Sequence, residues 1–370
     1  MFLRSVFVLF VLSGATAFAQ VEVPARAEQQ TKATAVQDPV QGGWAATPAA
    51  VDHETLDLFD ATRTPAQELD GLRMQRNEAL SRNKGSYTAA DKQQLDLSAD
   101  RINSAYPNSF EAHMANFYAS FPTVRSFTEL GAAATNAPER IELVGPQLAA
   151  AARQDDQPTL VARAKDMKAR GGVAPPLYLY AEDLLKSVDE KGVLIAAGEM
   201  DAYPLWVKQF AEGKRTDVLV IDRRMLPDPE YRGRMWGRAG ATGTVPPDEA
   251  SFIAKLHTST GRPVFLSLAV GAEVARTHAA LLSVTGLAMR MSESARGDMA
   301  KLGSLWKGMR KPTDAGPISK NYLIPGSLLL KYYRAMDDER NASELEAELR
   351  IMAQQLGATQ SMITNGIFLH

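Results

Sequence analysis

Cysteine is absent from all 370 positions of the chain. This absence excludes disulfide bonds and thiolate metal sites, because both need cysteine sulfur. A protein without such cross-links is stabilised by burying apolar side chains, which make up 45% of the residues. A chain of this length and composition can form two or three domains with hydrophobic cores.

Excess charge of either sign is also missing, since the net charge is −2. Nucleic acids and anionic membranes attract clustered positive charge, so we expect neither as a partner. The five histidines are scattered, with no His-x-His or His-Glu-x-x-His spacing, and no Gly-x-Ser-x-Gly sequence occurs. The sequence therefore predicts no metal site and implies no cofactor.

Long apolar runs are missing except for a short one at the N-terminus. This run follows Arg4, carries no charge and ends in Ala17-Phe18-Ala19, a small-x-small cleavage pattern. A membrane-spanning helix needs about 20 apolar residues, so we expect a signal peptide over residues 1–19 rather than an uncleaved anchor. The predicted location is periplasmic or secreted, with no stable membrane insertion after processing. Residues 20–60 are rich in Ala, Gln, Thr and Pro and are predicted to be a disordered leader.

Helical spacing of apolar residues indicates a helical domain over residues 61–190. The residues that recur at helical intervals are Leu69, Leu72, Arg73, Arg76 and Leu80. Further helices are expected over 91–106 and 109–121. Residues 138–153 and 159–169 form the clearest helical hairpin, which is tetratricopeptide-like. One hairpin without a clean repeat of about 34 residues leaves a plain helical bundle as an equal alternative.

The pattern changes near residue 191. Short apolar runs at 193–197, 217–221 and 263–269 alternate with helical segments, which predicts a small parallel α/β module over residues 191–310. Met289 and Met291 are expected on a core helix. Residues 311–370 are predicted to be a C-terminal helical hairpin, so the fold class is α/β plus all-α.

The first part of this module carries a recognisable order of motifs: a strand, an acidic turn, an aromatic-Pro-Leu-Trp helix start and an Arg-Thr-Asp-Val strand. The order resembles the soluble C-terminal region, a domain of unknown function, of a bacterial family of multi-spanning membrane proteins related to protein O-mannosyltransferases. Residues 262–290 and 321–350 resemble later segments of that family, so the resemblance covers about residues 191–355. The matching positions of the first segment are Gly198, Asp201, Tyr203, Pro204, Leu205, Trp206, Gln209, Gly213, Arg215, Thr216, Asp217 and Val218.

The resemblance implies the fold and an envelope setting, but it does not imply glycosyl transfer. In that family the transferase chemistry belongs to the membrane-embedded part, for which this sequence has no matching segment. The turn reads Glu199-Met200-Asp201-Ala202 where the family tends to have Asp-Asn-Asp-Thr. Both carboxylates are therefore kept, while the amide and the hydroxyl are lost.

This turn is the first candidate site, because ligands of open α/β sheets bind beyond the carboxyl ends of the strands. Glu199 and Asp201 are predicted to accept hydroxyl hydrogen bonds from a sugar or to act as an acid/base pair, with Tyr203 or Trp206 as a stacking face. In the competing structural interpretation, Asp201 caps the helix that begins near Tyr203 and Trp206 belongs to the core.

An arginine-rich segment gives a second candidate site, because five guanidinium groups occur within sixteen residues. Arg223 and Arg224, the first two, are candidate ligand-binding residues for a phosphate or an acidic glycan. The alternative is an ordinary solvated charge cluster. The other three arginines are Arg232, Arg234 and Arg238.

Two functions remain open at this stage. The first is a non-catalytic binding or scaffolding module of the cell envelope, related to glycans or envelope assembly, whose partner is an envelope protein or a glycan. The second is an envelope enzyme that acts on glycans through Glu199, Asp201 and Asp222. Carboxylates about 5–9.5 Å apart across an open cleft would favour the enzyme, whereas burial against backbone amides would favour a structural role.

Overall fold

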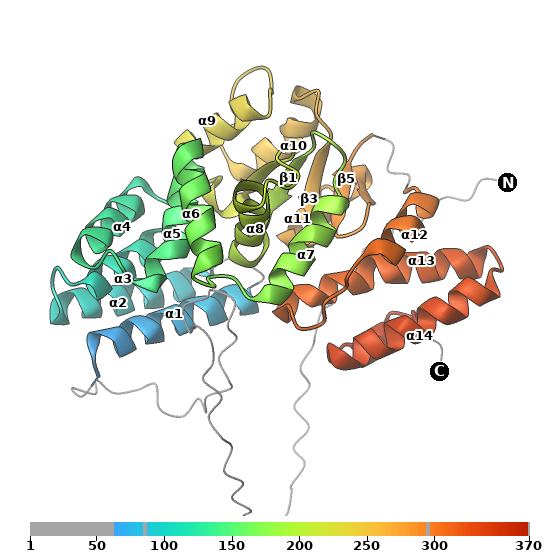
Figure 1. Ribbon diagram of the computed structural model, residues 1–370, viewed down its shortest axis with the longest axis horizontal. Coiled ribbons are helices and arrows are strands. Elements are labelled where there is room, and N and C mark those ends of the chain that lie inside the picture. Colours follow the sequence, from blue (N-terminus) through green and yellow to red (C-terminus); the bar gives the residue numbers. More distant parts are fainter. Residues whose placement is uncertain (1–62, 84–86, 294–296, 369–370) are drawn as a thin grey trace, which may run out of the picture.

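The computed structural model describes residues 63–83, 87–293 and 297–368. The expected signal peptide and leader lie outside the described residues. Helices α1–α4 lie at one end of the molecule, a small sheet lies in the middle, and the C-terminal helices lie at the other end (Figure 1). No helix of the described residues is both long and apolar enough to cross a membrane.

The first four helices form a unit with its own hydrophobic core. Thr64 and Thr88 each make a capping box, and the Ser109 side chain caps the third helix. The core of this unit includes Leu72, Ile102 and Phe117, and it is separate from the main core. The helices are α1 (Pro65–Arg82), α2 (Ala89–Ala105), α3 (Phe110–Ser120) and α4 (Val124–Asn136).

The next three helices pack against the sheet region and share its core. The expected hairpin is present as α5 (Val144–Gln154) and α6 (Gln157–Ala169). Asp155 adopts the left-handed conformation at the turn and Asp156 caps α6. Helix α7 (Pro175–Lys186) begins with two prolines and leads into the first strand. Proline is favourable in the first turn of a helix.

The sheet has five strands in the order β2-β1-β3-β5-β4. Strand β1 is parallel to β2 and β3, whereas β5 is antiparallel to β3 and β4. The fold class is confirmed, but the expectation of a purely parallel sheet is wrong on the β5–β4 side. The strands are β1 (Val193–Ala196), β2 (Leu219–Asp222), β3 (Val264–Ser267), β4 (Leu282–Val284) and β5 (Ala288–Met291).

A short connection explains the antiparallel pair. Only residues 285–287 join β4 to β5, which is too short for the crossover that parallel strands need. Met289 and Met291 lie on strand β5, so the expectation of a core helix at these positions is wrong, although both side chains are buried.

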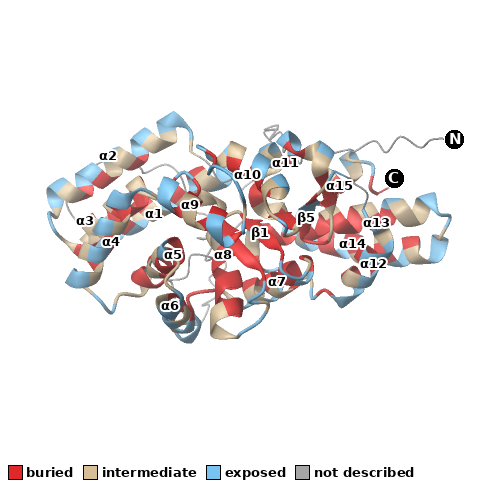
Figure 2. Cartoon of the chain, turned by 90° about the horizontal axis from the view of Figure 1, so that it is seen from above, coloured by how far each residue is buried: buried red, intermediate tan, exposed pale blue. Residues whose placement is uncertain are grey.

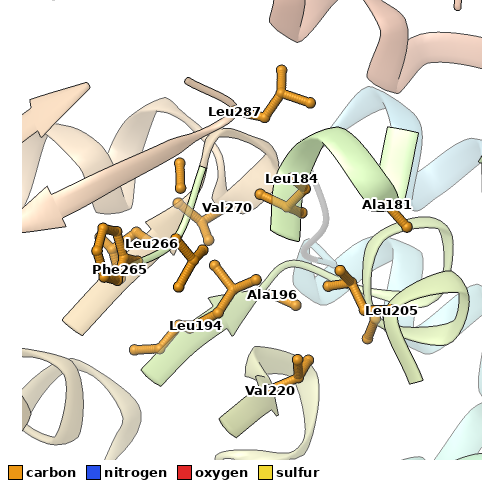
Figure 3. Packing of buried hydrophobic residues seen from close by; sticks show 14 of the residues in the cluster. Ala181, Leu184, Leu194, Ala196, Leu205, Val220, Phe265, Leu266, Val270 and Leu287 are labelled. Carbon is orange, nitrogen blue, oxygen red and sulfur yellow. The ribbon is translucent and has the colours of Figure 1, made fainter. Parts of the chain in front are cut away.

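The central core lies on both faces of this sheet. Every residue of strands β1, β2 and β3 is buried, and Figure 2 shows β1 in the buried centre of the molecule. Leu194 and Phe265 of the sheet pack with Leu184 of α7 and Leu205 of α8 (Figure 3). Helix α8 (Glu199–Trp206) continues as a π-helical turn over Val207–Ala211. The other helices of this region are α9 (Pro229–Arg238), α10 (Glu249–Ser259) and α11 (Ala272–Thr277).

The C-terminal helices form the expected hairpin together with two flanking helices. Gly326 allows a close approach, because a Cβ at this position would lie 3.0 Å from the Trp306 ring and clash with Leu349. The helices are α12 (Met299–Gly308), α13 (Leu323–Ala335), α14 (Glu339–Gln355) and α15 (Thr359–Thr364).

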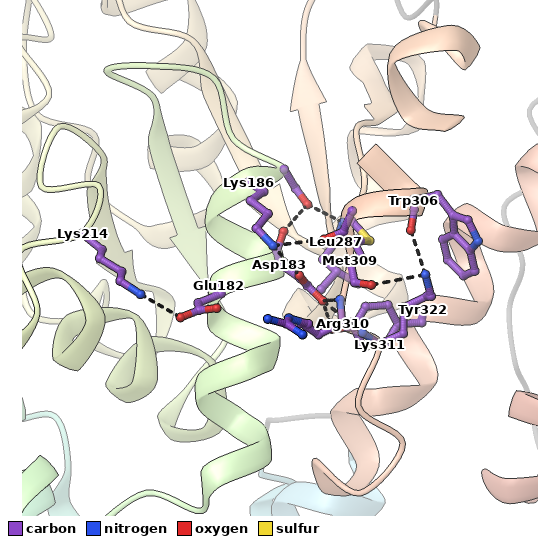
Figure 4. Close-up of polar contacts among 12 residues, drawn as sticks. Glu182, Asp183, Lys186, Lys214, Leu287, Trp306, Met309, Arg310, Lys311 and Tyr322 are labelled. Carbon is purple, nitrogen blue, oxygen red and sulfur yellow. Dashed lines mark hydrogen bonds and ion pairs between the residues drawn. The ribbon is translucent and has the colours of Figure 1, made fainter. Parts of the chain in front are cut away.

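Buried Asp183 of α7 attaches this C-terminal part to the centre of the molecule (Figure 4). Its Oδ2 accepts hydrogen bonds from the backbone amides of Arg310 (2.7 Å) and Lys311 (3.2 Å) and from the Tyr322 hydroxyl (2.9 Å). Lys186 pairs with its Oδ1 at 3.2 Å. This carboxylate is saturated by internal partners, which indicates a structural role.

Candidate functional site

The candidate carboxylates meet at one edge of the sheet. Strands β1 and β2 run parallel with Ala196 opposite Asp222, so both strands end at the same edge. Helix α8 begins at Glu199, three residues after β1 ends. The parallel pairing therefore brings Glu199, Asp201 and Asp222 to the edge where the sequence predicts a site.

Glu199 and Asp222 belong to a chain of alternating charges. The Oε1 atom of Glu199 accepts hydrogen bonds from the guanidinium groups of Arg76 (2.7 Å) and Arg224 (2.5 Å). Arg224 also binds Asp222 through its Nε at 3.1 Å and its Nη2 at 2.5 Å. We call Arg76, Glu199, Arg224 and Asp222 the ion chain. It joins α1 to the carboxyl edge of the sheet.

The ion chain is shielded from solvent. The side chains of Arg76 and Glu199 are 5% and 12% exposed, and that of Asp222 is fully buried. Burial alone would raise the pKa of Glu199, but the charges of Arg76 and Arg224 outweigh it and hold the pKa below its ordinary value. Burial likewise opposes the charge of Arg224, yet Asp222 and Glu199 raise its pKa well above the usual range. Glu199 and the two arginines therefore stay charged at neutral pH.

Aromatic rings enclose the two guanidinium groups. Arg224 lies 5.3 Å from the centre of the Phe121 ring and 5.5 Å from that of Tyr203, and Arg76 lies 5.5 Å from that of Tyr118. Tyr203 stacks on Trp206 with ring centres 5.8 Å apart. Tyr203 and Trp206 are 3% and 2% exposed, so they pack against the protein itself rather than offering an open stacking face.

Asp201 stands apart from the ion chain. Its Oδ2 accepts the Ala197 amide hydrogen at 2.8 Å, and its carboxylate also accepts a hydrogen bond from Ser267, at the end of β3. Its buried Oδ1 has no hydrogen-bond partner. Burial raises the pKa of Asp201 to about 6, aided by the nearby charge of Asp222 and opposed by these hydrogen bonds.

The capping role expected for Asp201 needs correction. The helix begins at Glu199 rather than near Tyr203, so Asp201 lies within its first turn. Its side chain binds the amide of Ala197, which precedes the helix. The carboxylate therefore holds the strand-to-helix connection instead of capping a later helix.

The arginine-rich segment divides between internal partners. Arg223 turns away from Arg224 to pair with Glu249 and to donate to the Val270 carbonyl at 3.0 Å. The last three arginines bind other parts of the chain in the same way. Arg232 donates to the carbonyls of Leu226 and Pro246, Arg234 to that of Arg153, and Arg238 pairs with Asp155. These contacts favour a structural role over a phosphate clamp.

The sequence alone does not predict that Arg76, Phe121 and Ser267 belong to this site. Arg76 carries a usable signal, because it falls on the apolar stripe of α1 beside buried Leu69 and Leu72. An arginine on a buried stripe requires a carboxylate partner. The sequence does not show which carboxylate this is.

The site offers little open space. The small cavity beside Glu199 and Tyr203 has a volume of about 10 Å³, close to the space of one water molecule. Within the part of the chain that the structure describes, no group of three or more His, Asp or Glu side chains is arranged to hold a metal ion. The chemistry of the site is therefore that of buried charges and one carboxyl group that titrates near neutral pH.

The motif that carries the family resemblance is largely built into the fold. Gln209 donates to the carbonyls of Arg215 (2.7 Å) and Val218 (2.8 Å). Arg215 donates to the carbonyls of Leu185 and Val188 and pairs with Asp217. These bonds fasten the α8–β2 connection to the end of α7.

Comparison with known proteins extends this observation. No curated protein and no solved structure matches the chain. One family model matches part of the chain, but segments 262–290 and 321–350, which also resemble the O-mannosyltransferase-related family, lie outside that match. The bacterial origin of that family stays a prediction. The match itself begins within α7, extends through β1, α8, β2 and α9, and includes the first motif segment. Residues 178–248 match the family of TMEM260-associated domain 2, named after a membrane protein related to protein O-mannosyltransferases.

Proposed function

We propose that the protein is a non-catalytic binding or scaffolding module of the cell envelope, related to glycans or envelope assembly. The observation that carries this proposal is the pairing of Glu199 and Asp222 with Arg76 and Arg224. A catalytic acid or base must be able to exchange a proton with its substrate. Removing one partner from a buried ion pair costs about 3–5 kcal/mol, so these carboxylates are poorly suited to such exchange.

The arrangement of helices supports the same proposal. Helices α1–α4 have a hydrophobic core of their own, and the ion chain connects them to the sheet. Such a unit presents a helical surface while the sheet region keeps it in place. The tetratricopeptide-like hairpin α5–α6 lies between the two parts.

Export is part of this proposal and rests on the charge pattern of residues 1–19. Mass spectrometry of the envelope fraction should find a mature chain that begins at or near Gln20. Recovery of the intact chain, starting at Met1, from the cytoplasm would refute export.

The binding function can be tested with the mature chain as bait in envelope extracts. We expect a specific envelope protein or glycan to be retained. Glu199→Gln, which weakens the attachment of α1 to the sheet region, should reduce the retained amount if the relative position of the helices matters. Retention of nothing by the folded mature chain would refute the proposal.

An enzyme acting on glycans is the second candidate, and Asp201 is the observation that favours it. Its unpartnered oxygen and its pKa of about 6 suit a group that exchanges protons near neutral pH. Asp201→Asn should then abolish hydrolysis of an envelope glycan while the folded state is retained. Equal hydrolysis by both proteins, or none by either, favours the binding module.

A further inference from the structure

A second cavity lies between α1 and α2, and Arg76 connects it to the ion chain. Its volume is about 160 Å³. Arg76 lines this cavity and binds Glu199. Ala79 and Leu95 also line it and are buried, so the innermost part of the cavity is apolar. We call this space the α1–α2 cavity.

Formal charges in the α1–α2 cavity cancel. Two arginines, Arg76 and Arg82, and two acids, Glu78 and Asp91, line it. Arg82 pairs with Asp91 at 2.6 Å, and its Nη1 lies 3.8 Å from Glu78. An anion such as phosphate would lie close to the two carboxylates, and a cation would lie close to the two guanidinium groups. The lining therefore favours a neutral ligand.

The remaining polar groups suit vicinal hydroxyls. Gln75 and Gln94 line the cavity, and a side-chain amide can both donate and accept hydrogen bonds. The Oε1 atom of Gln75 already accepts one from the Ser98 hydroxyl at 2.9 Å. Tyr87 lies two residues before α2 and contributes a half-buried phenol that is hydrogen-bonded to Arg76. Planar groups that donate and accept in pairs, next to an aromatic ring and apolar carbons, complement a molecule with hydroxyls around an apolar ring.

The volume limits the size of this molecule. A volume of about 160 Å³ is below the range of roughly 300–1,000 Å³ that is typical of drug-sized ligands. Space of this kind admits one six-membered ring but neither a nucleotide nor an entire oligosaccharide chain.

We propose that the α1–α2 cavity binds a single neutral sugar ring, free or as one residue of a glycan. This inference rests on the proposed binding function and gives it a site distinct from the carboxyl edge of the sheet. Arg76 both lines the cavity and belongs to the ion chain. A sugar in the cavity would therefore contact the residue that attaches α1 to Glu199.

The test is saturation-transfer NMR on the full mature chain with a panel of neutral methyl hexosides and N-acetylhexosaminides. Inorganic phosphate and glucuronate serve as charged probes. Gln94→Ala removes a polar group at the exposed rim of the cavity, and Gln93→Ala is its matched control, because Gln93 is equally exposed on α2 but does not line the cavity.

Loss of one hydrogen bond should weaken binding by about two- to tenfold. Tyr87→Ala should weaken it further, and thermal melting checks that each variant is folded.

Binding of at least one neutral hexoside, weakened by Gln94→Ala and Tyr87→Ala but not by Gln93→Ala, supports the site. Binding that none of these substitutions changes overturns the site and leaves the proposed function intact. Preference for phosphate or glucuronate, or binding of no hexoside at all, also overturns it. In the last case the retention of envelope partners by the mature chain decides separately whether the binding function stands.

Discussion

Glu199 shows how burial changes the effect of a single substitution. On an exposed surface, the replacement of a glutamate by glutamine would be nearly silent. In the structure one of its oxygens accepts hydrogen bonds from two guanidinium groups in a shielded site. A neutral amide leaves Arg76 and Arg224 with excess positive charge, and like charges in such a site repel each other.

We therefore predict that Glu199→Gln lowers the free energy of unfolding by about 3–5 kcal/mol, the usual cost of breaking a buried ion pair. Urea denaturation of the mature chain measures this change. Glu344→Gln is the matched control, because Glu344 pairs with Arg340 on the surface and such pairs contribute about 0.3–0.5 kcal/mol. Equal effects of the two substitutions would contradict the buried ion chain.

Asp201 leads to a prediction about pH. Its pKa is about 6 in the folded protein, compared with about 3.9 in an unfolded chain. Between these values the folded state holds a proton that the unfolded state has released, so this group stabilises the protein below about pH 4 and loses that contribution as pH rises to about 6. The loss amounts to about 3 kcal/mol.

Asp201→Asn removes this dependence while keeping an acceptor for the Ala197 amide. Its free energy of unfolding, relative to that of the wild-type chain, should increase from about pH 4 to about pH 6 and then stay constant. Urea denaturation across this range tests the difference, with the exposed Asp100→Asn as control. A difference that does not change with pH would show that folding does not raise the pKa of Asp201.

At the scale of elements, the connection between β4 and β5 depends on one glycine. Gly286 has φ of +122°, where side chains are strained, and a Cβ there would clash with the Ser187 side chain and lie 2.7 Å from Leu305. We predict that Gly286→Ala destabilises the protein by about 1–3 kcal/mol or more through overpacking and strain. Gly233→Ala in α9 meets nothing within 4 Å and should be neutral or stabilising by up to about 1 kcal/mol. Thermal melting distinguishes the two.

The sequence predicts the helices and strands whose apolar residues form a clear pattern. Strands β1, β2 and β3 and the α5–α6 hairpin fall close to their expected positions. Helix α4 is not predicted, because its buried face consists of Ser126, Leu130 and Ala133, which give a weak apolar pattern. Strands β4 and β5 are short and carry polar residues, so their pairing depends on the sheet that they join.

The site is only partly predictable for a similar reason. The order of strand, turn and helix places Glu199, Asp201 and Asp222 at one edge, as expected. One of the two arginine partners of Glu199, Arg76, comes from α1, 123 residues earlier in the chain. No local pattern links positions so far apart, because only the packing of α1 against the sheet region brings them together.

At the scale of the whole molecule, the ion chain connects two hydrophobic cores. One core belongs to α1–α4, and the other extends from α5 through the sheet to α15. Separate cores allow partly independent opening, so contacts between them decide how cooperatively the molecule unfolds. Arg76 and Glu199 form one such contact, with a side chain from each core region.

A double-mutant cycle on Arg76→Met and Glu199→Gln therefore measures how strongly the two parts are coupled. Because the two groups touch in a shielded site, we expect the effects on the free energy of unfolding to be non-additive by about 0.5–3 kcal/mol. Each single variant should also accelerate amide hydrogen exchange in α1–α4 more than in the sheet. The same cycle on Arg340 and Glu344 within α14 should give no more than about 0.5 kcal/mol. Additive effects at Arg76 and Glu199, with uniform exchange across both cores, would mean that apolar packing alone joins the two parts.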